Sequence, residues 1–360
     1  MVDDYRWMRR ALEHARRGLG RTTPNPVVGA CVVSDEGVVV GQGAHERAGE
    51  PHAEVNALEE AGSLARGATL YCTLEPCAHT GKTGPCTDRI IAAGIRRVVA
   101  AMEDPFPLVG GRGFATLRAH GIEVETGIGY EDAVRLNQPF LVTTRKGRPF
   151  VIMKAATSLD GRIAAAAGRR TQLTSTRALT HAQYMRAQVD AIVIGSETVL
   201  VDDPRLTARE VYRERPLTRV VLDRRLRTPP AARLLSTLPA GPVIILTTPD
   251  AARSARAGAL RNRGVSVLPV AGESMTAALS MLSGLDVQSV VLEGGAQVQR
   301  SAWDEGVVDY VQLYLAPVWL GEEGVPLLEG CTFSPMALLE RRVEQLGPDV
   351  LIEGYVHRPH

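Results

Sequence analysis

The sequence predicts an α/β protein of two domains, and three observations support this prediction. The chain has 360 residues, more than the roughly 250 to 300 at which a single hydrophobic core stops growing. Short apolar runs suited to strands alternate with segments of helical periodicity in both halves. The stretch from Thr143 to Pro149 separates the two halves and is expected to be a hinge. We therefore expect one domain at residues 1–145 and a second at residues 146–360.

The composition is that of an ordinary globular protein. Hydrophobic residues make up 45% and charged residues 22%, and the formal net charge is +1. The near-neutral charge and the aromatic content of 4% disfavour binding to nucleic acid or to an anionic membrane. The sequence contains no apolar run near the roughly 18 residues of a membrane span, and it begins with acidic residues where a signal peptide would be basic. We expect a cytoplasmic protein.

The first half alternates strands with helices, which predicts a sheet covered on both faces. Asp3 or Asp4 is expected to cap the first helix, and His52 is expected to open a later helix that Gly62 closes. Further helices are predicted at residues 87–93, 112–119 and 131–142, and strands at residues 27–33, 38–43, 68–73 and 98–102, with an edge strand at 122–126.

In the second half, an apolar run from Val287 to Glu293 leads into Gly294 and Gly295. A helix is predicted to follow at residues 296–303. Backbone N–H groups at such a helix start, with no Cβ in the way, are typical of a pyrophosphate site. Further strands are predicted at residues 150–156, 220–222, 243–247, 265–269 and 310–315.

One imidazole and two thiols in the first half suggest a metal site. His52 follows Pro51 at a predicted helix start, and Cys77 and Cys86 flank a loop of eight residues. Three such ligands with an open fourth position are typical of catalytic zinc, which makes a bound water acidic enough to ionise near pH 7. The alternative is a closed structural zinc site, for which His79 is the nearby candidate ligand. The five cysteines are few and odd in number, which argues against a disulfide framework.

Glu54 lies two residues after His52, where its carboxylate could take a proton from the zinc-bound water and return it to a leaving amine. The order H-x-E followed by P-C-x-x-C is typical of zinc deaminases. This chain departs from that order because eight residues, not two, separate Cys77 from Cys86.

The long loop between the cysteines, with residues 23–29, 48–54 and 73–76, resembles the deaminase half of the bifunctional riboflavin-biosynthesis deaminase/reductase family. The resemblance implies a cytidine-deaminase-like α/β/α sandwich that acts on a small phosphorylated pyrimidine. The implied substrate contacts are Asn25, His45, His79 and Lys82. Asn25 also suits a plain turn between prolines, whereas the ammonium and backbone N–H groups around Lys82 could hold the substrate phosphate.

Residues 150–164 and 187–207 are similar to the reductase half of the same family, a dihydrofolate-reductase-like domain that uses NADPH. Lys154 ends a buried run, where an unpaired ammonium is costly, so it should point toward a substrate oxygen or a phosphate. The resemblance makes Lys154 and Asp202 the candidate catalytic groups. It implies NADPH contacts at Ala156, Gln172, Thr198, Asp202, Gly295, Ala296, Gln297, Val298, Gln299, Arg300 and Ser301, and substrate contacts at Arg170, Arg186, Leu206, Arg209 and Glu293.

One departure from the family lies at residues 170–172. Relatives usually have Ser-x-Trp there, whereas this chain has Arg170-Thr171-Gln172, so Arg170 could instead grip the 2′-phosphate of NADP. The expected function is zinc-dependent deamination of 2,5-diamino-6-(5-phosphoribosylamino)pyrimidin-4-one followed by NADPH-dependent reduction of the ribosyl to a ribityl chain. The alternative is an active deaminase whose impaired reductase domain serves as a dimerisation platform. The family also implies a homo-oligomer, a dimer or a tetramer.

Overall fold

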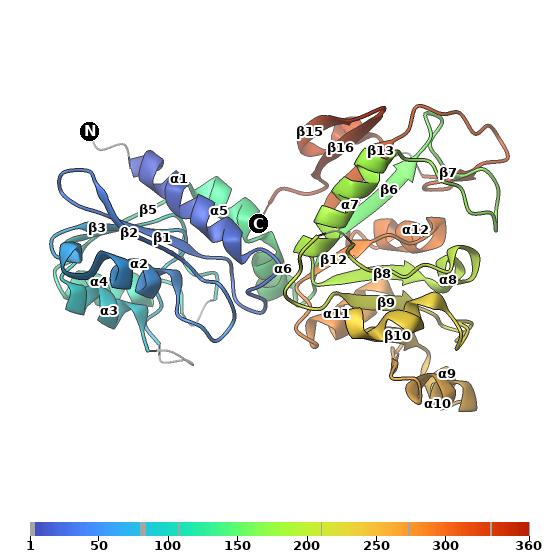
Figure 1. Cartoon of the computed structure of the whole chain (residues 1–360), viewed down its shortest axis with the longest axis horizontal. Coiled ribbons are helices and arrows are strands. Elements are labelled where there is room, and N and C mark those ends of the chain that lie inside the picture. The colour runs from blue at the N-terminus through green and yellow to red at the C-terminus, as the bar shows by residue number, and fades with distance from the viewer. Residues whose placement is uncertain are drawn as a thin grey trace. The chain divides into compact units, whose positions relative to one another are not determined.

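The computed structural model describes residues 4–79, 84–106, 109–209, 211–272, 274–331 and 333–359. The chain forms two compact units, Met1–Lys146 with Pro359–His360, and Gly147–Arg358 (Figure 1). The expected boundary after residue 145 lies one residue before this division. The expected hinge is not irregular throughout, because residues 143–146 belong to the helix α6 (Gln138–Lys146) and the Arg148 guanidinium is buried against the Asp309 carboxylate.

The first unit is built on a five-stranded sheet in the order β2-β1-β3-β4-β5. Strand β1 runs antiparallel to both β2 and β3, and the β3–β4 and β4–β5 pairs are parallel. The strands are β1 (Gly29–Val33), β2 (Val39–Ala44), β3 (Thr69–Cys72), β4 (Arg97–Ala100) and β5 (Glu123–Thr126), and the remaining helices are α1 (Asp4–Ala15), α2 (Ala53–Ala61), α3 (Cys86–Ala93), α4 (Arg112–Ala119) and α5 (Tyr130–Leu136).

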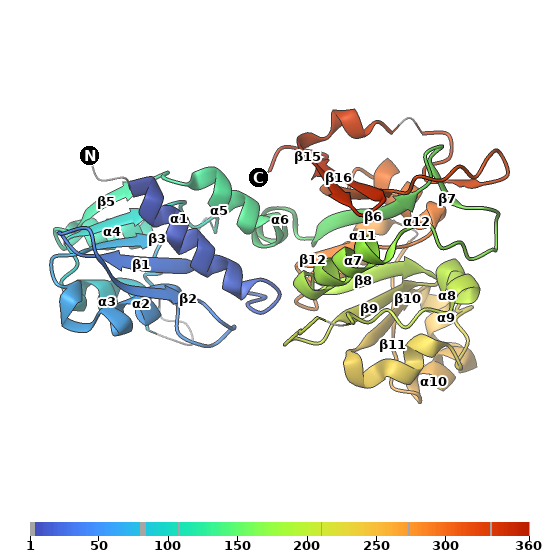
Figure 2. The same cartoon turned by 45° about the horizontal axis from the view of Figure 1, so that its top comes forward.

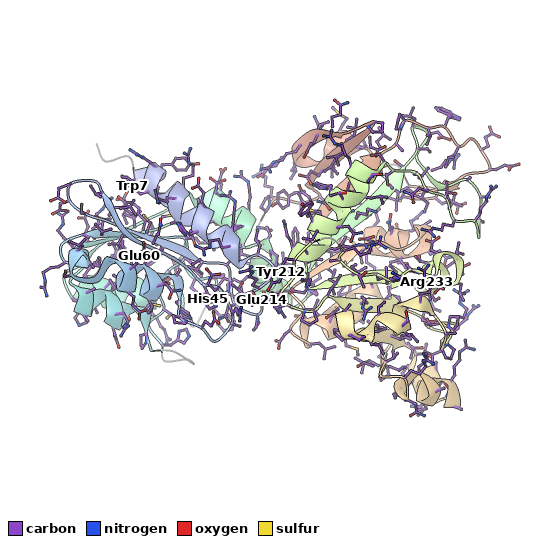
Figure 3. The ribbon with its side chains drawn as sticks, viewed as in Figure 1. Trp7, His45, Glu60, Tyr212, Glu214 and Arg233 are labelled. Atoms are coloured by element: carbon purple, nitrogen blue, oxygen red, sulfur yellow. The ribbon has the colours of Figure 1, made fainter. Side chains whose placement is uncertain are left out.

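Helices α1 and α2 cover opposite faces of this sheet (Figures 1 and 2), and Figure 3 labels Trp7 on the first and Glu60 on the second. Both helices approach the strands so closely that glycine is required. A Cβ on Gly29 would lie 2.0 Å from the Ala11 carbonyl oxygen of α1, and one on Gly43 would lie 2.4 Å from the Ala53 carbonyl oxygen of α2. The predicted α/β class of this half is confirmed.

The single helix predicted over residues 131–142 is wrong, because α5 and α6 are separate helices that meet at Asn137. The buried Asn137 carboxamide accepts a hydrogen bond from the Val27 N–H at 2.9 Å and donates one to the Val27 carbonyl at 3.0 Å. Val27 is thus held by a side chain and lies outside β1, which begins two residues later than predicted.

The second unit is built on a nine-stranded sheet in the order β11-β10-β9-β8-β12-β6-β13-β16-β15. All neighbouring strands from β11 to β13 run parallel, and the last two pairs are antiparallel. The strands are β6 (Phe150–Thr157), β8 (Ala191–Gly195), β9 (Thr218–Leu222), β10 (Val243–Thr247), β11 (Ser266–Pro269), β12 (Ser289–Leu292), β13 (Tyr310–Leu315), β15 (Leu339–Leu346) and β16 (Asp349–Tyr355), while β7 (Arg162–Ala164) and β14 (Val325–Pro326) pair separately.

Helices cover both faces of the second sheet (Figure 2). The helix α7 (Thr176–Gln188) packs Ala178 and Ala182 against Tyr314 and Ala156 on one face. The helices α11 (Met275–Ser283) and α12 (Ala296–Asp304) pack against Val151, Met153 and Ala155 on the other. The remaining helices are α8 (Ser196–Asp202), α9 (Pro249–Ala252) and α10 (Ala255–Arg261). In the described parts of the chain, we find no helix with the length and apolar character of a membrane span.

Candidate active sites

His52, Cys77 and Cys86 lie together in the first unit. His52 is the N-cap of α2, Cys86 is the first residue of α3, and Cys77 lies in the segment that follows β3. The Nδ1 atom of His52 is 3.2 Å from Cys86 Sγ and 3.5 Å from Cys77 Sγ. Each residue therefore turns its ligand atom toward the same small volume.

These separations fit a zinc ion. Around tetrahedral zinc, with Zn–S near 2.3 Å and Zn–N near 2.0 Å, the nitrogen and a sulfur would be about 3.5 Å apart. Within the described ranges, these three residues are the only group of His, Cys, Asp or Glu donors close enough to hold a metal. His79, the candidate for a closed site, is exposed and does not belong to the group. The donor set therefore leaves the fourth position open.

The three ligand groups lie close enough to shift one another's pKa values. A hydrogen bond from the Cys86 thiol lowers the pKa of Cys77, which also accepts a hydrogen bond from the Cys86 backbone N–H at 3.4 Å. The same bond raises the pKa of Cys86, and the Cys77 sulfur raises the pKa of His52. Cysteine and histidine bind a metal only in their deprotonated forms, so binding of a divalent cation here would release protons from these groups.

Glu54 is buried in the first turn of α2, with an exposed fraction of 3%. Burial raises the pKa of its carboxyl to about 7, although His52 acts in the opposite direction. A carboxyl with a pKa near neutrality can both accept and return a proton at pH 7, which is what a general acid/base requires.

Two of the four predicted substrate contacts are paired beside the metal ligands. His45, which directly follows β2 (Figure 3), lies with its ring centroid 5.3 Å from that of His52. Asn25 Nδ2 is 3.0 Å from His45 Nε2, and the opposite ring nitrogen of His45 is 3.1 Å from the Pro51 carbonyl oxygen. Asn25 and His45 therefore border the candidate metal site, whereas His79 is exposed and Lys82 lies outside the described residues.

The role of Glu75 could not be predicted from the sequence. Its buried carboxylate accepts four backbone hydrogen bonds, from Asp104 at 3.1 Å, Gly111 at 2.9 Å, Gly113 at 2.8 Å and Phe114 at 3.3 Å. The segment before α4 is thereby tied to the loop that carries Cys77. Only contacts distant in sequence could have revealed this function.

In the second unit, Lys154, Arg186 and Glu293 form one charged cluster. Arg186 donates two hydrogen bonds of 2.7 Å to the Glu293 carboxylate, and Lys154 Nζ lies 4.0 Å from the same group. Burial would raise the pKa of Glu293, but Arg186 and Lys154 hold it at about 2. Burial lowers the pKa of Lys154, an effect that Glu293 opposes. The lysine is therefore a partly desolvated ammonium beside a fixed carboxylate.

Lys154 also lies over an aromatic ring. Its Nζ is 5.4 Å from the ring centroid of Tyr314, a fully buried residue of β13. The Tyr314 hydroxyl is 2.8 Å from Nδ1 of His181 on α7. Neither Tyr314 nor His181 was predicted, because their relation to Lys154 depends on sheet register and helix packing.

A cleft of about 710 Å³ opens at the carboxyl ends of β8, β9 and β10, beside the start of α12. Ligands of open α/β sheets usually bind at this edge. Six of the predicted NADPH contacts line the cleft, namely Thr198, Gly295, Ala296, Gln297, Val298 and Ser301. The glycines suit this place, because a Cβ on Gly195 or Gly294 would lie 2.8 Å from the Val298 side chain.

The other predicted residues of this half lie elsewhere, and their roles stay predictions. Gln299 is buried and donates to the Lys154 carbonyl, and Arg300 bonds to Asp304. Gln172 bonds to the Thr174 carbonyl. Ala156 is on β6, Leu206 is buried with a φ of 54°, and the Arg209 N–H donates to Gln183.

Asp202, at the end of α8, is electrostatically linked to Arg170. Burial raises the pKa of Asp202, and the Arg170 charge lowers it. Arg170 is exposed and is absent from the residues that line the cleft.

Three arginines that line the cleft were missed. Arg224, Arg225 and Arg227 follow directly after β9. A cluster of cations at the carboxyl end of an apolar strand is visible in the sequence, and that position is the signal that could have found them.

Comparison with protein families gives two matches that together span most of the chain. Residues 1–102 match the cytidine and deoxycytidylate deaminase zinc-binding region. Residues 149–352 match the RibD C-terminal domain.

Whole-chain relatives are equally consistent. The riboflavin biosynthesis protein RibD of Aquifex aeolicus is 40% identical, with 97% of each chain covered. RibD of Escherichia coli K12 is 39% identical over 98% of this chain and 99% of its own. Among solved structures, Acinetobacter baumannii RibD superposes with a TM-score of 0.86 at 37% identity, covering 97% of this chain and 98% of that one. A Thermotoga maritima deaminase/reductase superposes with a TM-score of 0.84 at 35% identity, covering 97% of both chains.

Proposed function

The chain belongs to the RibD family of riboflavin-biosynthesis enzymes, and from this premise we propose which of its residues carry the two reactions. As a member, it is a bifunctional enzyme with a zinc-dependent deaminase half and an NADPH-dependent reductase half. The predicted cytidine-deaminase-like and dihydrofolate-reductase-like folds agree with these matches.

The proposed substrates follow from the Thermotoga maritima relative, described as a diaminohydroxyphosphoribosylaminopyrimidine deaminase and a 5-amino-6-(5-phosphoribosylamino)uracil reductase. We assign the same two substrates to this chain. Hydrolytic deamination replaces one ring amine with oxygen and releases ammonia, which turns the diaminopyrimidine into the aminouracil, so the product of the first reaction is the substrate of the second.

For deamination, we assign His52, Cys77 and Cys86 as the zinc ligands. This assignment is supported by the convergence of the three side chains in the unit that also contains the buried Glu54. When bound there, zinc would supply a water molecule that ionises near neutral pH. Glu54 accepts the proton of the attacking water and delivers it to the leaving amine. Asn25 and His45, linked to each other beside His52, orient the pyrimidine ring.

For reduction, the proposal places the dinucleotide in the cleft, with its pyrophosphate at the start of α12. NADPH bound there would supply the hydride. Lys154, held by Glu293 and Tyr314, donates a hydrogen bond to the carbonyl oxygen of the opened sugar and so favours the developing alkoxide. Asp202 is the second candidate for the group that supplies a proton to this alkoxide.

The zinc assignment is tested by metal content and by both activities. Cys86→Ser should lose zinc and deamination but keep oxidation of NADPH by the deaminated intermediate, because the reductase residues lie in the other unit. Cys72→Ala is the matched control, since Cys72 is a buried free thiol of the same unit outside the donor group. Full zinc content in Cys86→Ser, or joint loss of both activities, would contradict the assignment.

Two broader features complete the proposal. Strand β15 ends the nine-stranded sheet, and seven of its eight residues are exposed, so its edge can pair with a second copy. This supports a homo-oligomer formed through the reductase half, which light scattering would test. Zinc-binding thiols must stay reduced, and this requirement supports the cytoplasm as the compartment.

A further inference from the structure

The segment between α8 and β9, residues 203–209 and 211–217, is hydrogen-bonded to α7. The Arg209 N–H donates to the Gln183 carboxamide oxygen at 2.8 Å, and the Thr207 carbonyl accepts a hydrogen bond from Arg186 Nη1 at 3.1 Å. Gln183 and Arg186 are three residues apart in the sequence, so they lie on the same face of α7. One face of the helix therefore binds this segment at two points.

Arg213 forms a third link, at the C-terminal end of α7. Its Nη1 atom donates to the Arg186 carbonyl at 2.7 Å and to the Ala187 carbonyl at 2.9 Å. The last four carbonyls of a helix have no donor within the helix, and α7 ends at Gln188, so Arg213 satisfies two of these four. The negative end of the helix dipole also favours a cation there. Burial lowers the pKa of Arg213 to about 10, which leaves the group charged at pH 7.

Arg186 is therefore bonded through both its backbone and its side chain. Its carbonyl accepts a hydrogen bond from Arg213, and its guanidinium donates to Glu293 and to the Thr207 carbonyl. Glu293 in turn lies 4.0 Å from Lys154, the proposed catalytic group. The segment that supplies Arg213 is thus connected, through Arg186, to the charged cluster of the reductase.

The same segment carries Leu206 and Arg209, two of the predicted substrate contacts. Leu206 is buried and has a φ of 54°, a conformation that a residue other than glycine keeps only where the surrounding contacts impose it. The bonds of Arg209 and Arg213 to α7 fix the chain directly after Leu206. Arg213 therefore helps to impose the conformation in which both predicted contacts are presented.

We propose that Arg213 is a positioning residue of the reductase, which fixes this segment against α7 and so sets Arg186 and Arg209 to receive the substrate. The inference rests on the proposed function, which places the reduction at Lys154. Without the Arg213 guanidinium, the segment is in place in only a fraction of the molecules, and the apparent affinity for the substrate falls by that fraction. Bound substrate restores the segment, so the KM changes more than the kcat.

The test is the steady-state kinetics of NADPH oxidation by the deaminated intermediate. Arg213→Met should raise the KM for the intermediate about 10- to 100-fold and leave kcat and NADP⁺ binding within about 2-fold. Arg213→Lys keeps a cation at the helix end and should recover part of the loss. The control is Arg215→Met, which removes a neighbouring charge that pairs with the Asp190 carboxylate at 2.8 Å and should keep the wild-type KM. A merely destabilising effect would lower the active fraction, and hence kcat, without changing the KM.

Trypsin gives a readout that does not depend on activity. Arg205 and Arg209 are exposed cleavage sites within the segment. Arg213→Met should be cut after these residues faster than the wild type, and the intermediate should slow the cleavage. A wild-type KM in Arg213→Met, or an equal rise of the KM in Arg215→Met, would overturn the inference.

A separate variant distinguishes this inference from the proposed function. Lys154→Met should lower the reductase kcat, with thermal unfolding confirming that the unit is folded. If Lys154→Met reduces the intermediate as the wild type does, the assignment of the reductase site itself fails. If it loses kcat while Arg213→Met keeps the wild-type KM, only the inference about Arg213 fails.

Discussion

Arg186 and Glu293 form a bidentate ion pair, in which Nε and Nη2 of the arginine each lie 2.7 Å from a carboxylate oxygen. The third nitrogen of Arg186 donates to the Thr207 carbonyl at 3.1 Å, and Lys154 lies 4.0 Å from Glu293. One buried carboxylate therefore fixes both the proposed catalytic lysine and the segment after α8. Loss of the Glu293 carboxylate should therefore lower both the stability of the unit and the rate of reduction.

The depressed pKa of Glu293 predicts a pH-dependent contribution to stability. The folded value of about 2, against 4.5 for the ordinary group, corresponds to about 3 kcal/mol at neutral pH. Because the folded pKa is lowered, this contribution is complete above about pH 4.5 and is lost as the pH falls toward 2. Glu293→Gln, which mimics the protonated carboxyl, should lower the melting temperature at pH 7. Thermal scans should show the difference from wild type shrinking between pH 4.5 and 2, and a constant difference would argue against the ion pair.

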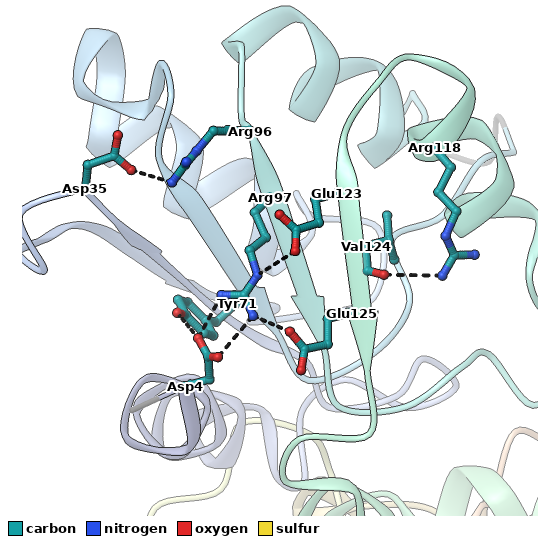
Figure 4. Close-up of polar contacts among 9 residues, drawn as sticks. All are labelled: Asp4, Asp35, Tyr71, Arg96, Arg97, Arg118, Glu123, Val124 and Glu125. Atoms are coloured by element: carbon teal, nitrogen blue, oxygen red, sulfur yellow. Dashed lines mark hydrogen bonds and ion pairs between the residues drawn. The ribbon is translucent and has the colours of Figure 1, made fainter. Parts of the chain in front are cut away.

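Arg97 holds the first helix of the deaminase unit to the sheet (Figure 4). It donates to both oxygens of Asp4, at 2.8 and 3.0 Å, and also bonds to Glu125. Tyr71 donates a hydrogen bond to the same Asp4 carboxylate at 2.6 Å. Asp4, the first residue of α1, therefore accepts hydrogen bonds from both Arg97 and Tyr71. Arg97→Met should leave partly buried carboxylates unpaired and cost about 2 to 4 kcal/mol in denaturant unfolding.

Its neighbour Arg96 provides the matched control for this prediction. Arg96 pairs with Asp35 at 2.6 Å, but the two side chains are 64% and 61% exposed (Figure 4). An exposed ion pair contributes little, so Arg96→Met should cost less than about 1 kcal/mol. Equal losses in the two variants would mean that burial of the Arg97 cluster is not what stabilises the unit.

Asn137 should be needed both for stability and for the first activity. Its carboxamide satisfies the Val27 N–H and carbonyl, two residues from Asn25. Asn137→Ala leaves both buried groups without this partner, so the free energy of unfolding should fall by about 2 to 4 kcal/mol. The KM of the deaminase should rise because the turn bearing Asn25 loosens. An unchanged KM would show that this turn does not position the substrate.

Tyr314 should act on reduction through the position of Lys154. Tyr314→Phe keeps the ring under the ammonium and loses only the bond to His181, whereas Tyr314→Leu loses both. A cation–π contact of about 0.5 to 2 kcal/mol corresponds to roughly 2- to 30-fold in rate. We expect the reductase kcat to fall clearly in Tyr314→Leu and little in Tyr314→Phe, with the deaminase rate as the internal control. Equal loss in both variants would assign the role to the hydroxyl.

Ligand chemistry explains why the metal cluster could be predicted from sequence. One imidazole and two thiols are the donors that zinc prefers, and His52 and Cys86 at two helix starts do converge with Cys77, which follows β3. The Glu75 carboxylate was missed because its four donors come from residues 104–114, which reach it only in the folded chain.

The errors in secondary structure have similar causes. The break between α5 and α6 depends on the contact of Asn137 with Val27, more than a hundred residues away. The hairpin of β15 and β16 was not predicted, because residues 339–346 are mostly polar and only Leu346 among them is buried. Such an exposed edge strand lacks the apolar alternation by which strands are found.

The most direct test of the account is to measure zinc content and deaminase rate on the same preparation of Glu54→Gln. We predict wild-type zinc content, because Glu54 is not among the ligands, a deaminase rate lowered about 100-fold or more, and unchanged NADPH oxidation. A deaminase rate near that of the wild type, with zinc retained, would contradict the account, because the proton would then be moved by another group.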